Sequence, residues 1–275
     1  MLHLGLIGDN IAASSAPKLH RLAGRQNRIE VRYDRLVPRD EGLDFEALLA
    51  ACPARGYRGL NITYPYKERA IARVSVPDAL VQAMGAINTI LFDPEGARGF
   101  NTDYTGFVAT YRAARGARDP GTVCLVGTGG VGRAIAFALV ALGAGEIRLV
   151  DQAPERAAAL ARDLAPVAGR TRLLCVDRVE QGAAGATGVI NATPLGMVGL
   201  GGTAVPETAL TGVEWAFDAV YTPVETEFLD AAARQGATTI SGYELFFFQG
   251  VHAWAHFSGL PLDEAALRAA LAAAE

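Results

Sequence analysis

A glycine-rich segment, "VCLVGTGGVGRA" at residues 123–134, constrains the fold of this chain more than any other. Gly127, Gly129 and Gly132 follow an apolar run and precede a helical pattern, in the spacing G-x-G-x-x-G. Glycine lets the backbone approach a pyrophosphate closely, and the N-terminus of the next helix offers free N–H groups. The segment therefore predicts a parallel α/β domain that binds a dinucleotide.

Asp151 indicates which dinucleotide. It ends the next apolar run, 24 positions after Gly127. A carboxylate there accepts hydrogen bonds from a ribose 2′-hydroxyl and repels a 2′-phosphate. Gln152 and Ala153 follow, so the adjacent positions offer no cation for a phosphate. We expect NAD rather than NADP, although NADP stays possible; in the alternative interpretation Asp151 only caps a helix that begins near Pro154.

Apolar runs and helical patterns alternate along both halves of the chain, which predicts an α/β protein with a mostly parallel sheet in each half. The first half has expected strands and helices at 2–8, 17–26, 29–37, 44–52, 59–65, 77–84 and 86–93, with a turn at 94–97. After a connection at 117–121 the second half continues with 122–127, 130–143, 146–151, 154–165, 172–177, 188–193, 214–220, 225–235 and 238–242, and ends in helices at 243–257 and 263–275. A length of 275 residues favours two domains.

Composition excludes several classes of function. Net charge is −4 with 20% charged and 51% hydrophobic residues, which is unlike a polyanion-binding protein, so we expect no nucleic-acid partner. The sequence shows neither a signal peptide nor an apolar stretch of bilayer-spanning length, so we expect no membrane association and a cytoplasmic location. Cys52, Cys124 and Cys175 fit buried thiols better than disulfides or a zinc site.

Three polar segments follow apolar runs in the first half: "NITYPYK" (61–67), "INT" (87–89) and "FNTD" (100–103). Ligands of α/β proteins bind at the carboxyl ends of parallel strands. One Asn-Thr pair alone would indicate a turn. Together, the three segments predict a hydrogen-bonding cage for a hydroxylated small molecule.

Two further features have competing interpretations. Ser14 and Ser15 precede Pro17, an arrangement typical of a helix N-terminus. His252 and His256 lie four residues apart on an expected helix, but no carboxylate or cysteine motif completes a metal site, so we expect no metal.

The chain resembles the shikimate/quinate dehydrogenases along its whole length. The motifs that carry the resemblance occur in family order: "NITYPYK", "GAINT", "GFNTD", "GTGGVG", "NATPLGM", "DAVYTPVET" and "SGYELFFFQG". The resemblance implies a substrate domain at 1–103 plus 243–275 and a Rossmann-like nucleotide domain at 104–242. It also implies NAD(P)-dependent hydride transfer at C3 of shikimate or quinate, a role in the shikimate pathway, and a monomer or homodimer.

The resemblance also assigns residues. Lys67 and Asp103 correspond to the catalytic pair. Residues expected at the substrate are Ser14, Asn61, Thr63, Asn88, Tyr221 and Gln249; those expected at the nucleotide are Gly127, Gly129, Gly130, Gly132, Asp151, Thr193 and Met197. Alcohol oxidation by hydride transfer releases a proton that a base must accept, and a lysine of lowered pKa can do so. Our hypothesis is that Lys67 is the principal acid/base and Asp103 its partner.

One position departs from the family pattern. The loop before the first helix usually reads Ser-x-Ser-Pro or Ser-x-Thr-Pro, and its two hydroxyls bind the substrate carboxylate; here it reads Ser14-Ser15-Ala16-Pro17. We expect weaker carboxylate binding or a shifted substrate. Alternatives are an enzyme for a modified cyclitol acid, such as an aminoshikimate, and a nucleotide-binding regulatory module without turnover. The presence of both Lys67 and Asp103 disfavours the module.

Overall fold

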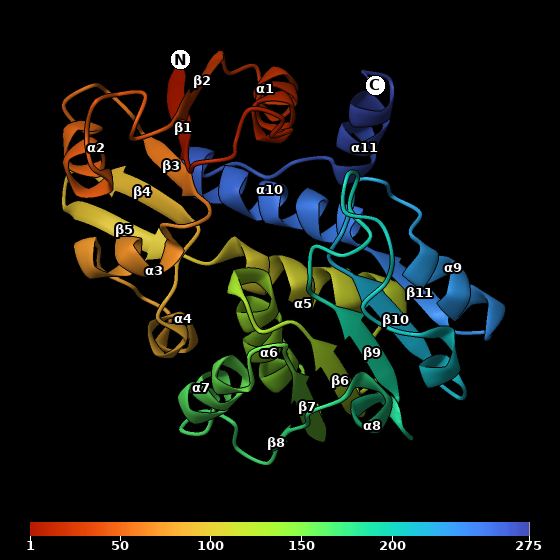
Figure 1. Cartoon of the computed structure of the whole chain (residues 1–275). Coiled ribbons are helices and arrows are strands. Elements are labelled where there is room, and N and C mark those ends of the chain that lie inside the picture. Colours follow the sequence, from red (N-terminus) through yellow and green to blue (C-terminus); the bar gives the residue numbers. More distant parts are fainter. Residues whose placement is uncertain (275) are drawn as a thin grey trace. The chain divides into compact units, whose positions relative to one another are not determined.

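The computed structural model describes residues 1–274, and the chain forms two compact units. Unit 1 comprises Met1–Thr102 and the chain from Gln249 onward, and unit 2 comprises Asp103–Phe248. In Figure 1, unit 1 has the red to yellow colours and the darkest blue, and unit 2 has the colours between them. Within the described residues, no helix has both the length and the apolar character needed to cross a bilayer.

Unit 1 contains a five-stranded sheet in the order β2-β1-β3-β4-β5. The strands are Leu2–Ile7 (β1), Val31–Leu36 (β2), Gly59–Ile62 (β3), Thr89–Asp93 (β4) and Gly96–Phe100 (β5). β1 pairs in parallel with β2 and β3, as the alternation of strands and helices predicted. β4 runs antiparallel to β3 and β5. Because two residues can join only antiparallel neighbours, β4 and β5 form a hairpin, and this sheet is less parallel than expected.

Five short helices lie wholly in the two chain segments of unit 1. They are α1 (Ala16–Gln26), α2 (Phe45–Ala51), α3 (Lys67–Ala70), α4 (Ala79–Met84) and α11 (Glu264–Ala272), with a 3₁₀ turn at Ile71–Arg73. α10 (Gly242–Ser258) begins in unit 2 and ends in unit 1. Asp263 caps α11, since its carboxylate accepts a hydrogen bond from the N–H of Ala266 at 3.0 Å.

The hydrophobic core of unit 1 combines residues from the two ends of the chain. Leu4 and Leu6 of β1 pack in one buried cluster with Ala253, Trp254 and Phe257 of α10. Close approach is possible where side chains are absent: a Cβ on Gly59 would lie 2.5 Å from the Phe257 ring. The last part of α10 is therefore an integral part of unit 1.

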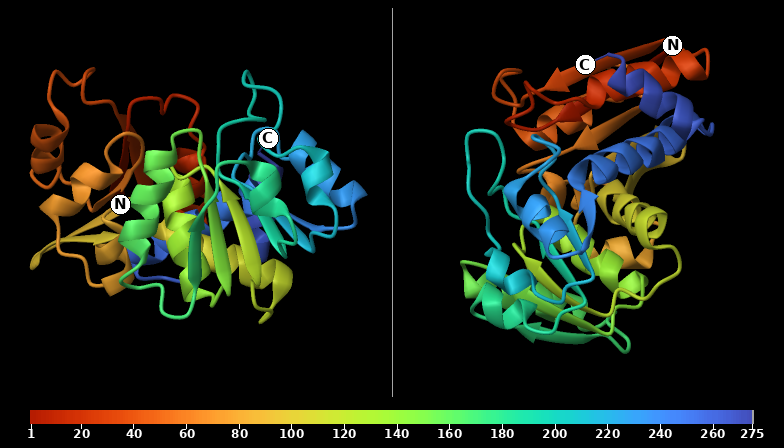
Figure 2. Two further views of the ribbon diagram at one scale, coloured as in Figure 1. Left: turned by 60° about the horizontal axis from the view of Figure 1, so that its bottom comes forward. Right: turned by 90° about the vertical axis from the view of Figure 1, so that its right-hand side faces the viewer.

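Unit 2 contains a six-stranded, fully parallel sheet in the order β11-β10-β9-β6-β7-β8. The strands are Thr122–Val126 (β6), Glu146–Val150 (β7), Arg172–Cys175 (β8), Gly188–Asn191 (β9), Trp215–Asp218 (β10) and Thr238–Ser241 (β11), and Figure 2 shows them side by side. This order is that of a doubly wound dinucleotide-binding domain, with the strand order reversing between β6 and β9. The predicted architecture is confirmed.

The helices of unit 2 match most of the predicted segments. They are α5 (Thr102–Arg115, whose first residue belongs to unit 1), α6 (Gly130–Ala141), α7 (Pro154–Leu164), α8 (Val179–Ala183) and α9 (Glu227–Arg234), with a 3₁₀ turn at Glu207–Leu210. The sequence patterns did not predict α5 or α8. α5 carries several threonines and a glycine, which have low helix propensity, and its stability comes from packing of Phe107 and Tyr111, both fully buried.

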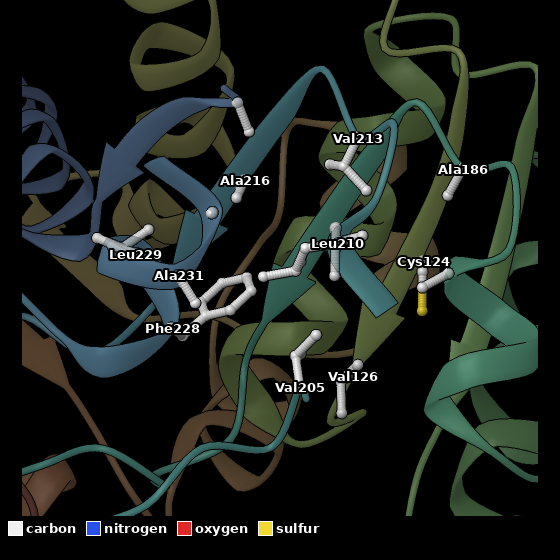
Figure 3. Close-up of a cluster of buried hydrophobic side chains, with 14 of the residues drawn as sticks. Cys124, Val126, Ala186, Val205, Leu210, Val213, Ala216, Phe228, Leu229 and Ala231 are labelled. Atoms are coloured by element: carbon white, nitrogen blue, oxygen red, sulfur yellow. The ribbon is translucent and has the colours of Figure 1, made fainter. Parts of the chain in front are cut away.

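One apolar cluster of unit 2 joins strands β6 and β10 to helix α9. Phe228 packs there with Leu210 and Val205, beside Val126 and Cys124 (Figure 3). Cys52 and Cys124 are buried free thiols, as expected, but Cys175 is exposed. Cys175 ends β8, an edge strand with mostly exposed residues, so the prediction of burial is wrong there.

Candidate active site

Two of the predicted substrate residues belong to one buried polar network in unit 1. The Asn88 side-chain oxygen accepts hydrogen bonds from the Thr102 N–H at 2.7 Å, the Thr102 hydroxyl at 3.1 Å and the Thr89 hydroxyl at 3.0 Å. The Asn61 amide donates to the Thr89 hydroxyl at 3.2 Å and accepts from the Tyr33 hydroxyl at 2.9 Å. The three Asn-Thr segments thus meet, at the ends of β3, β4 and β5.

The network fixes the start of the helix that carries Asp103. Thr102 is the first residue of α5, and both its N–H and its hydroxyl are held by Asn88. Asp103 is the next residue and is 9% exposed. Asn88 therefore has a structural task that the sequence did not reveal, because hydrogen bonding between residues 14 positions apart depends on the hairpin between them.

Lys67 is the first residue of α3, and the segment Thr63–Tyr66 separates it from the end of β3. Its side chain is partly buried, and its backbone carbonyl accepts a hydrogen bond from Ile87 N–H at 3.1 Å. Thr63, four positions earlier, is partly buried too, and its N–H donates to the Ile7 carbonyl at 2.9 Å. Both residues lie at the carboxyl end of the parallel part of the unit 1 sheet, where α/β ligands bind.

The Ser14 loop lies between β1 and α1. Ser14 Oγ accepts a hydrogen bond from Ala16 N–H at 3.3 Å, and Arg35 donates to the Ser14 carbonyl at 2.8 Å. Ser15 occupies the N-cap position of α1, but its side chain makes no capping hydrogen bond within the described residues. Ser15 therefore lies at the predicted N-cap position, but its hydroxyl does not form the predicted capping hydrogen bond. The Ala16 methyl packs against the apolar cluster of unit 1.

Gln249 and the two histidines lie on α10. Gln249, the first residue of the second segment of unit 1, is partly buried. His256 stacks on Phe100 at 3.7 Å between ring centroids, and burial lowers its pKa to about 4, helped by the charges of His252 and Arg98. Within residues 1–274 no three His, Cys, Asp or Glu side chains are grouped as metal ligands.

In unit 2, the glycines of the G-x-G-x-x-G segment form a tight turn between β6 and α6. Gly127 has a φ of 94°, which favours glycine, and its N–H donates to the Val150 carbonyl at 2.8 Å. A Cβ on Gly132 would lie 2.0 Å from the Gly127 carbonyl oxygen, whereas a Cβ on Gly129 would meet open space. Gly129 is the N-cap of α6 and has no side chain that could cap the helix. Gly130 is its first residue, so the turn leaves N–H donors open at a helix N-terminus, a geometry suited to a pyrophosphate.

Asp151 contacts this turn directly. One carboxylate oxygen accepts hydrogen bonds from the Thr128 N–H at 2.8 Å and the Thr128 hydroxyl at 2.7 Å, and the other accepts from the Ala153 N–H at 3.0 Å. Burial alone would raise the pKa of Asp151, but these hydrogen bonds lower it below its ordinary value. A carboxylate offers about four acceptor sites, so capacity for one further donor remains. The helix-cap alternative is not what the structure shows, since the N-cap of α7 is Ala153.

A second buried network orders the "NATPLGM" and "DAVYTPVET" segments. Asn191 accepts from the Thr193 N–H at 3.0 Å and hydroxyl at 2.7 Å, and donates to Asp218 at 2.9 Å. Asp218 also accepts from the Thr226 hydroxyl at 2.6 Å, and burial raises the pKa of this carboxyl despite these hydrogen bonds. Asn191 and Asp218 end β9 and β10. Sequence reasoning did not single them out, although a polar residue that ends an apolar strand is a usable signal.

Two predicted residues of these segments are exposed. Met197 is 41% exposed, and Tyr221 is 39% exposed and stacks on Phe246 at 5.4 Å between ring centroids. The two segments are joined by a hydrogen bond from Val198 N–H to the Thr222 carbonyl at 3.0 Å. Each segment thus presents an accessible apolar or aromatic side chain above the carboxyl ends of β9 and β10.

Comparison with known proteins identifies similar sequences and structures. A family model described as the shikimate dehydrogenase substrate binding domain matches residues 6–90. A quinate/shikimate dehydrogenase (NAD(+)) of Corynebacterium efficiens is 38% identical over 97% of this chain and 96% of its own. A shikimate dehydrogenase (NADP(+)) of Streptomyces avermitilis is 39% identical over 98% of this chain and 94% of its own.

Solved structures give the same result. Quinate dehydrogenase from Corynebacterium glutamicum in complex with NAD superimposes with a TM-score of 0.93 at 36% identity, covering 99% of both chains. Shikimate 5-dehydrogenase from Thermus thermophilus in complex with NADP(H) and shikimate gives a TM-score of 0.86 at 31% identity, covering 100% of both chains. The likeness therefore extends through both units.

Proposed function

Because this chain belongs to the shikimate/quinate dehydrogenase family, we propose that it oxidises the C3 hydroxyl of quinate or shikimate with NAD as its preferred acceptor. Family membership makes it an oxidoreductase that uses NAD or NADP. Relatives of nearly equal identity are named for different cofactors. Overall identity therefore does not decide the cofactor, and individual residues must.

Asp151 is the observation that carries the preference for NAD. Its carboxylate accepts hydrogen bonds from Thr128 within the glycine turn, so its charge is held just after the end of β7, where the adenosine ribose is expected. A fixed negative charge there repels a 2′-phosphate, whereas its remaining acceptor capacity suits a ribose hydroxyl. The open N-terminus of α6 and the space at Gly129 fit a dinucleotide.

The proposed chemistry divides between the cofactor and the chain. NAD supplies a hydride acceptor when bound, and the chain manages the proton. Lys67 accepts the proton of the C3 hydroxyl during oxidation and returns it during reduction, and Asp103 is its partner. Ser14, Asn61, Thr63, Asn88, Tyr221 and Gln249 are the proposed substrate residues; Thr193 and Met197, with Gly127, Gly129, Gly130, Gly132 and Asp151, are those for the nucleotide.

The substrate domain of this proposal is unit 1, and the nucleotide domain is unit 2. The family model for substrate binding matches residues 6–90, within unit 1. The parallel sheet and the glycine turn belong to unit 2. We further propose that the enzyme acts on dissolved cyclitol acids in the cytoplasm.

Initial rates for quinate and shikimate, each with NAD and with NADP, test the proposal. We expect kcat/KM with NAD to exceed that with NADP by tenfold or more, because repulsion of a 2′-phosphate by Asp151 weakens binding. Comparable or better turnover with NADP would contradict the role of Asp151. Absence of turnover with every cyclitol acid, despite NAD binding, would favour a regulatory nucleotide-binding module.

A further inference from the structure

Two loops of unit 1 are tied together beside Lys67. The loop Gly8–Ser15 follows β1, and the segment Thr63–Tyr66 follows β3. Asp9 N–H donates to the Tyr64 carbonyl at 3.2 Å, and the Tyr66 hydroxyl donates to the Asp9 carboxylate at 2.6 Å. The loops approach closely, since a Cβ on Gly8 would lie 2.3 Å from the Thr63 side chain.

The helix that begins with Lys67 cannot hold its own position. α3 has four residues, and its N-terminal hydrogen bond runs from Ala70 N–H to the Tyr66 carbonyl at 2.9 Å. A helix of one turn is unstable in isolation, because nucleation costs more than so few hydrogen bonds return. The placement of Lys67 therefore depends on tertiary contacts of the residues around it, and Tyr66 is adjacent to it in the chain.

The Tyr66 ring is fixed from two sides. It stacks on Phe45 with ring centroids 4.6 Å apart and planes 2° apart. The Arg69 guanidinium lies 5.3 Å from the centre of the Phe45 ring and 5.4 Å from that of the Tyr66 ring, and its Nε donates to Glu46 at 3.0 Å. These contacts hold the ring against α2. The hydroxyl alone reaches the loop that follows β1.

In the Tyr66–Asp9 hydrogen bond, the phenol is the donor and the carboxylate is the acceptor. The short distance is typical of a hydroxyl donor and a charged acceptor. This bond to Asp9, more than burial, raises the pKa of the Tyr66 phenol, so the phenol keeps its proton. Tyr66 is 8% exposed, whereas Asp9 is exposed. The hydroxyl can therefore be removed by Tyr66→Phe while the packing of the ring stays in place.

We propose that Asp9 and Tyr66 form a positioning pair that fixes the segment carrying Lys67 relative to the loop Gly8–Ser15. The inference rests on the proposed function, in which Lys67 transfers the proton. Neither residue needs to touch the substrate in this role. Loss of the pair loosens the alignment of Lys67, and misalignment of a catalytic group reduces the rate of the chemical step more than substrate affinity.

The chain offers a matched control. The Tyr57 hydroxyl donates to the Asp34 carboxylate at 2.8 Å, and the Tyr57 ring stacks on His3 at 3.8 Å between centroids. Tyr57→Phe thus removes the same kind of hydrogen bond from a stacked ring of the same unit, away from the Lys67 segment. The two Phe variants should lower Tm by similar amounts.

The experiment compares kcat, KM and the pH profile of kcat for quinate oxidation. We expect Tyr66→Phe and Asp9→Ala each to lower kcat at least tenfold and to shift the pH of half-maximal kcat, with less than threefold change in KM. Asp9→Asn should keep more than half of wild-type kcat, because an amide oxygen still accepts from the phenol. The double variant Tyr66→Phe/Asp9→Ala should lose no more than either single variant, since both remove one interaction. Tyr57→Phe should stay within twofold of wild-type kcat.

The positioning pair is wrong if Tyr66→Phe and Asp9→Ala keep kcat within twofold of wild type, or lose no more than Tyr57→Phe. Asp9 is exposed, so Asp9→Ala keeps the test decisive even where Tyr66→Phe fails to fold. Lys67→Ala separates the two levels of inference. If this variant keeps wild-type kcat, the proposed acid/base assignment fails; if it loses activity while Tyr66→Phe and Asp9→Ala do not, only the positioning pair fails.

Discussion

Ala16 is the residue at which we expect this chain to depart from the family pattern, and the structure shows where its methyl lies. The methyl packs against the apolar cluster of unit 1, while the neighbouring Ser14 hydroxyl accepts from the Ala16 N–H. Position 16 therefore contributes an apolar packing contact and offers no second hydroxyl donor to the substrate carboxylate. A charged hydrogen bond of this kind contributes about 1.5–3 kcal/mol, roughly ten- to a hundredfold in affinity.

Ala16→Ser should lower the KM for shikimate about tenfold and leave kcat nearly unchanged. The added hydroxyl supplies a donor for the carboxylate, at a small loss of Tm because it also meets the apolar cluster. Steady-state kinetics with a thermal melt measure both effects. Ser15→Ala serves as the control, since the Ser15 side chain makes no capping bond. An unchanged KM in Ala16→Ser together with a raised KM in Ser15→Ala would show that Ser15 already provides the donor.

At the residue scale, the sequence predicted which polar residues lie at the ends of strands better than it predicted their hydrogen-bond partners. Asp151 was expected at the end of β7, and it is there, but its bond to Thr128 depends on the exact path of the glycine turn. Asn88 was expected in a ligand cage, yet its oxygen is used by Thr89 and Thr102. Side-chain partners are set by backbone geometry between distant positions, which periodicity and propensity do not encode.

At the scale of elements, the turn between β6 and α6 contains two glycines that are needed for different reasons, Gly129 and Gly132. Gly132 lacks a side chain because the Gly127 carbonyl lies where its Cβ would be, whereas Gly129 faces open space. The first is a requirement of helix–strand packing and the second a requirement of ligand approach. Substitution by alanine should therefore have different consequences at the two positions.

Gly132→Ala should lower Tm by several degrees and also abolish measurable NAD binding, because α6 must move away from β6. Gly129→Ala should leave Tm within about one degree of wild type and raise the Kd for NAD tenfold or more. Differential scanning fluorimetry for Tm and isothermal titration calorimetry with NAD for Kd distinguish the two. An equal loss of Tm in both variants would contradict the separation.

Prediction of whole elements succeeded where the pattern was repetitive. The six strands of unit 2 alternate with helices at regular spacing, and each was expected within a few residues of its place. α5 was not predicted because its threonines and glycine have low helix propensity. The helix is stabilised instead by burial of Phe107 and Tyr111. The hairpin of β4 and β5 was expected only as a turn, since two of the five residues of β5 are glycines, which are rare in strands.

At the scale of the whole molecule, a buried histidine should reduce stability in acid. His20 is 1% exposed and stacks on Tyr33 with ring centroids 5.2 Å apart. Burial lowers its pKa to about 4, although a hydrogen bond with Asn61 opposes the shift. In the unfolded chain a histidine titrates near 6.5. The unfolded state therefore binds more protons between these two pH values, and the free energy of unfolding falls as the pH falls.

The stability of the protein should decline by up to about 3 kcal/mol from this residue alone between pH 6.5 and pH 4, at 1.36 kcal/mol per pKa unit. His20→Leu should remove that part of the decline, because leucine does not titrate. Urea unfolding at pH 7 and pH 5 measures the difference. A decline of the same size in the variant would assign the acid sensitivity to other groups, of which His256 is the next candidate.

The division of unit 1 between the two ends of the chain also sets an order for its biogenesis. Unit 2 is continuous from Asp103 to Phe248, so its core is complete once that stretch has left the ribosome. The core of unit 1 needs Trp254 and Phe257, which are synthesised only after the whole of unit 2. The apolar surface of residues 1–102 therefore stays uncovered by α10 while unit 2 is synthesised and can fold. We therefore expect the core of the proposed substrate domain to be completed after that of the nucleotide domain, although most of its residues precede that domain in the chain.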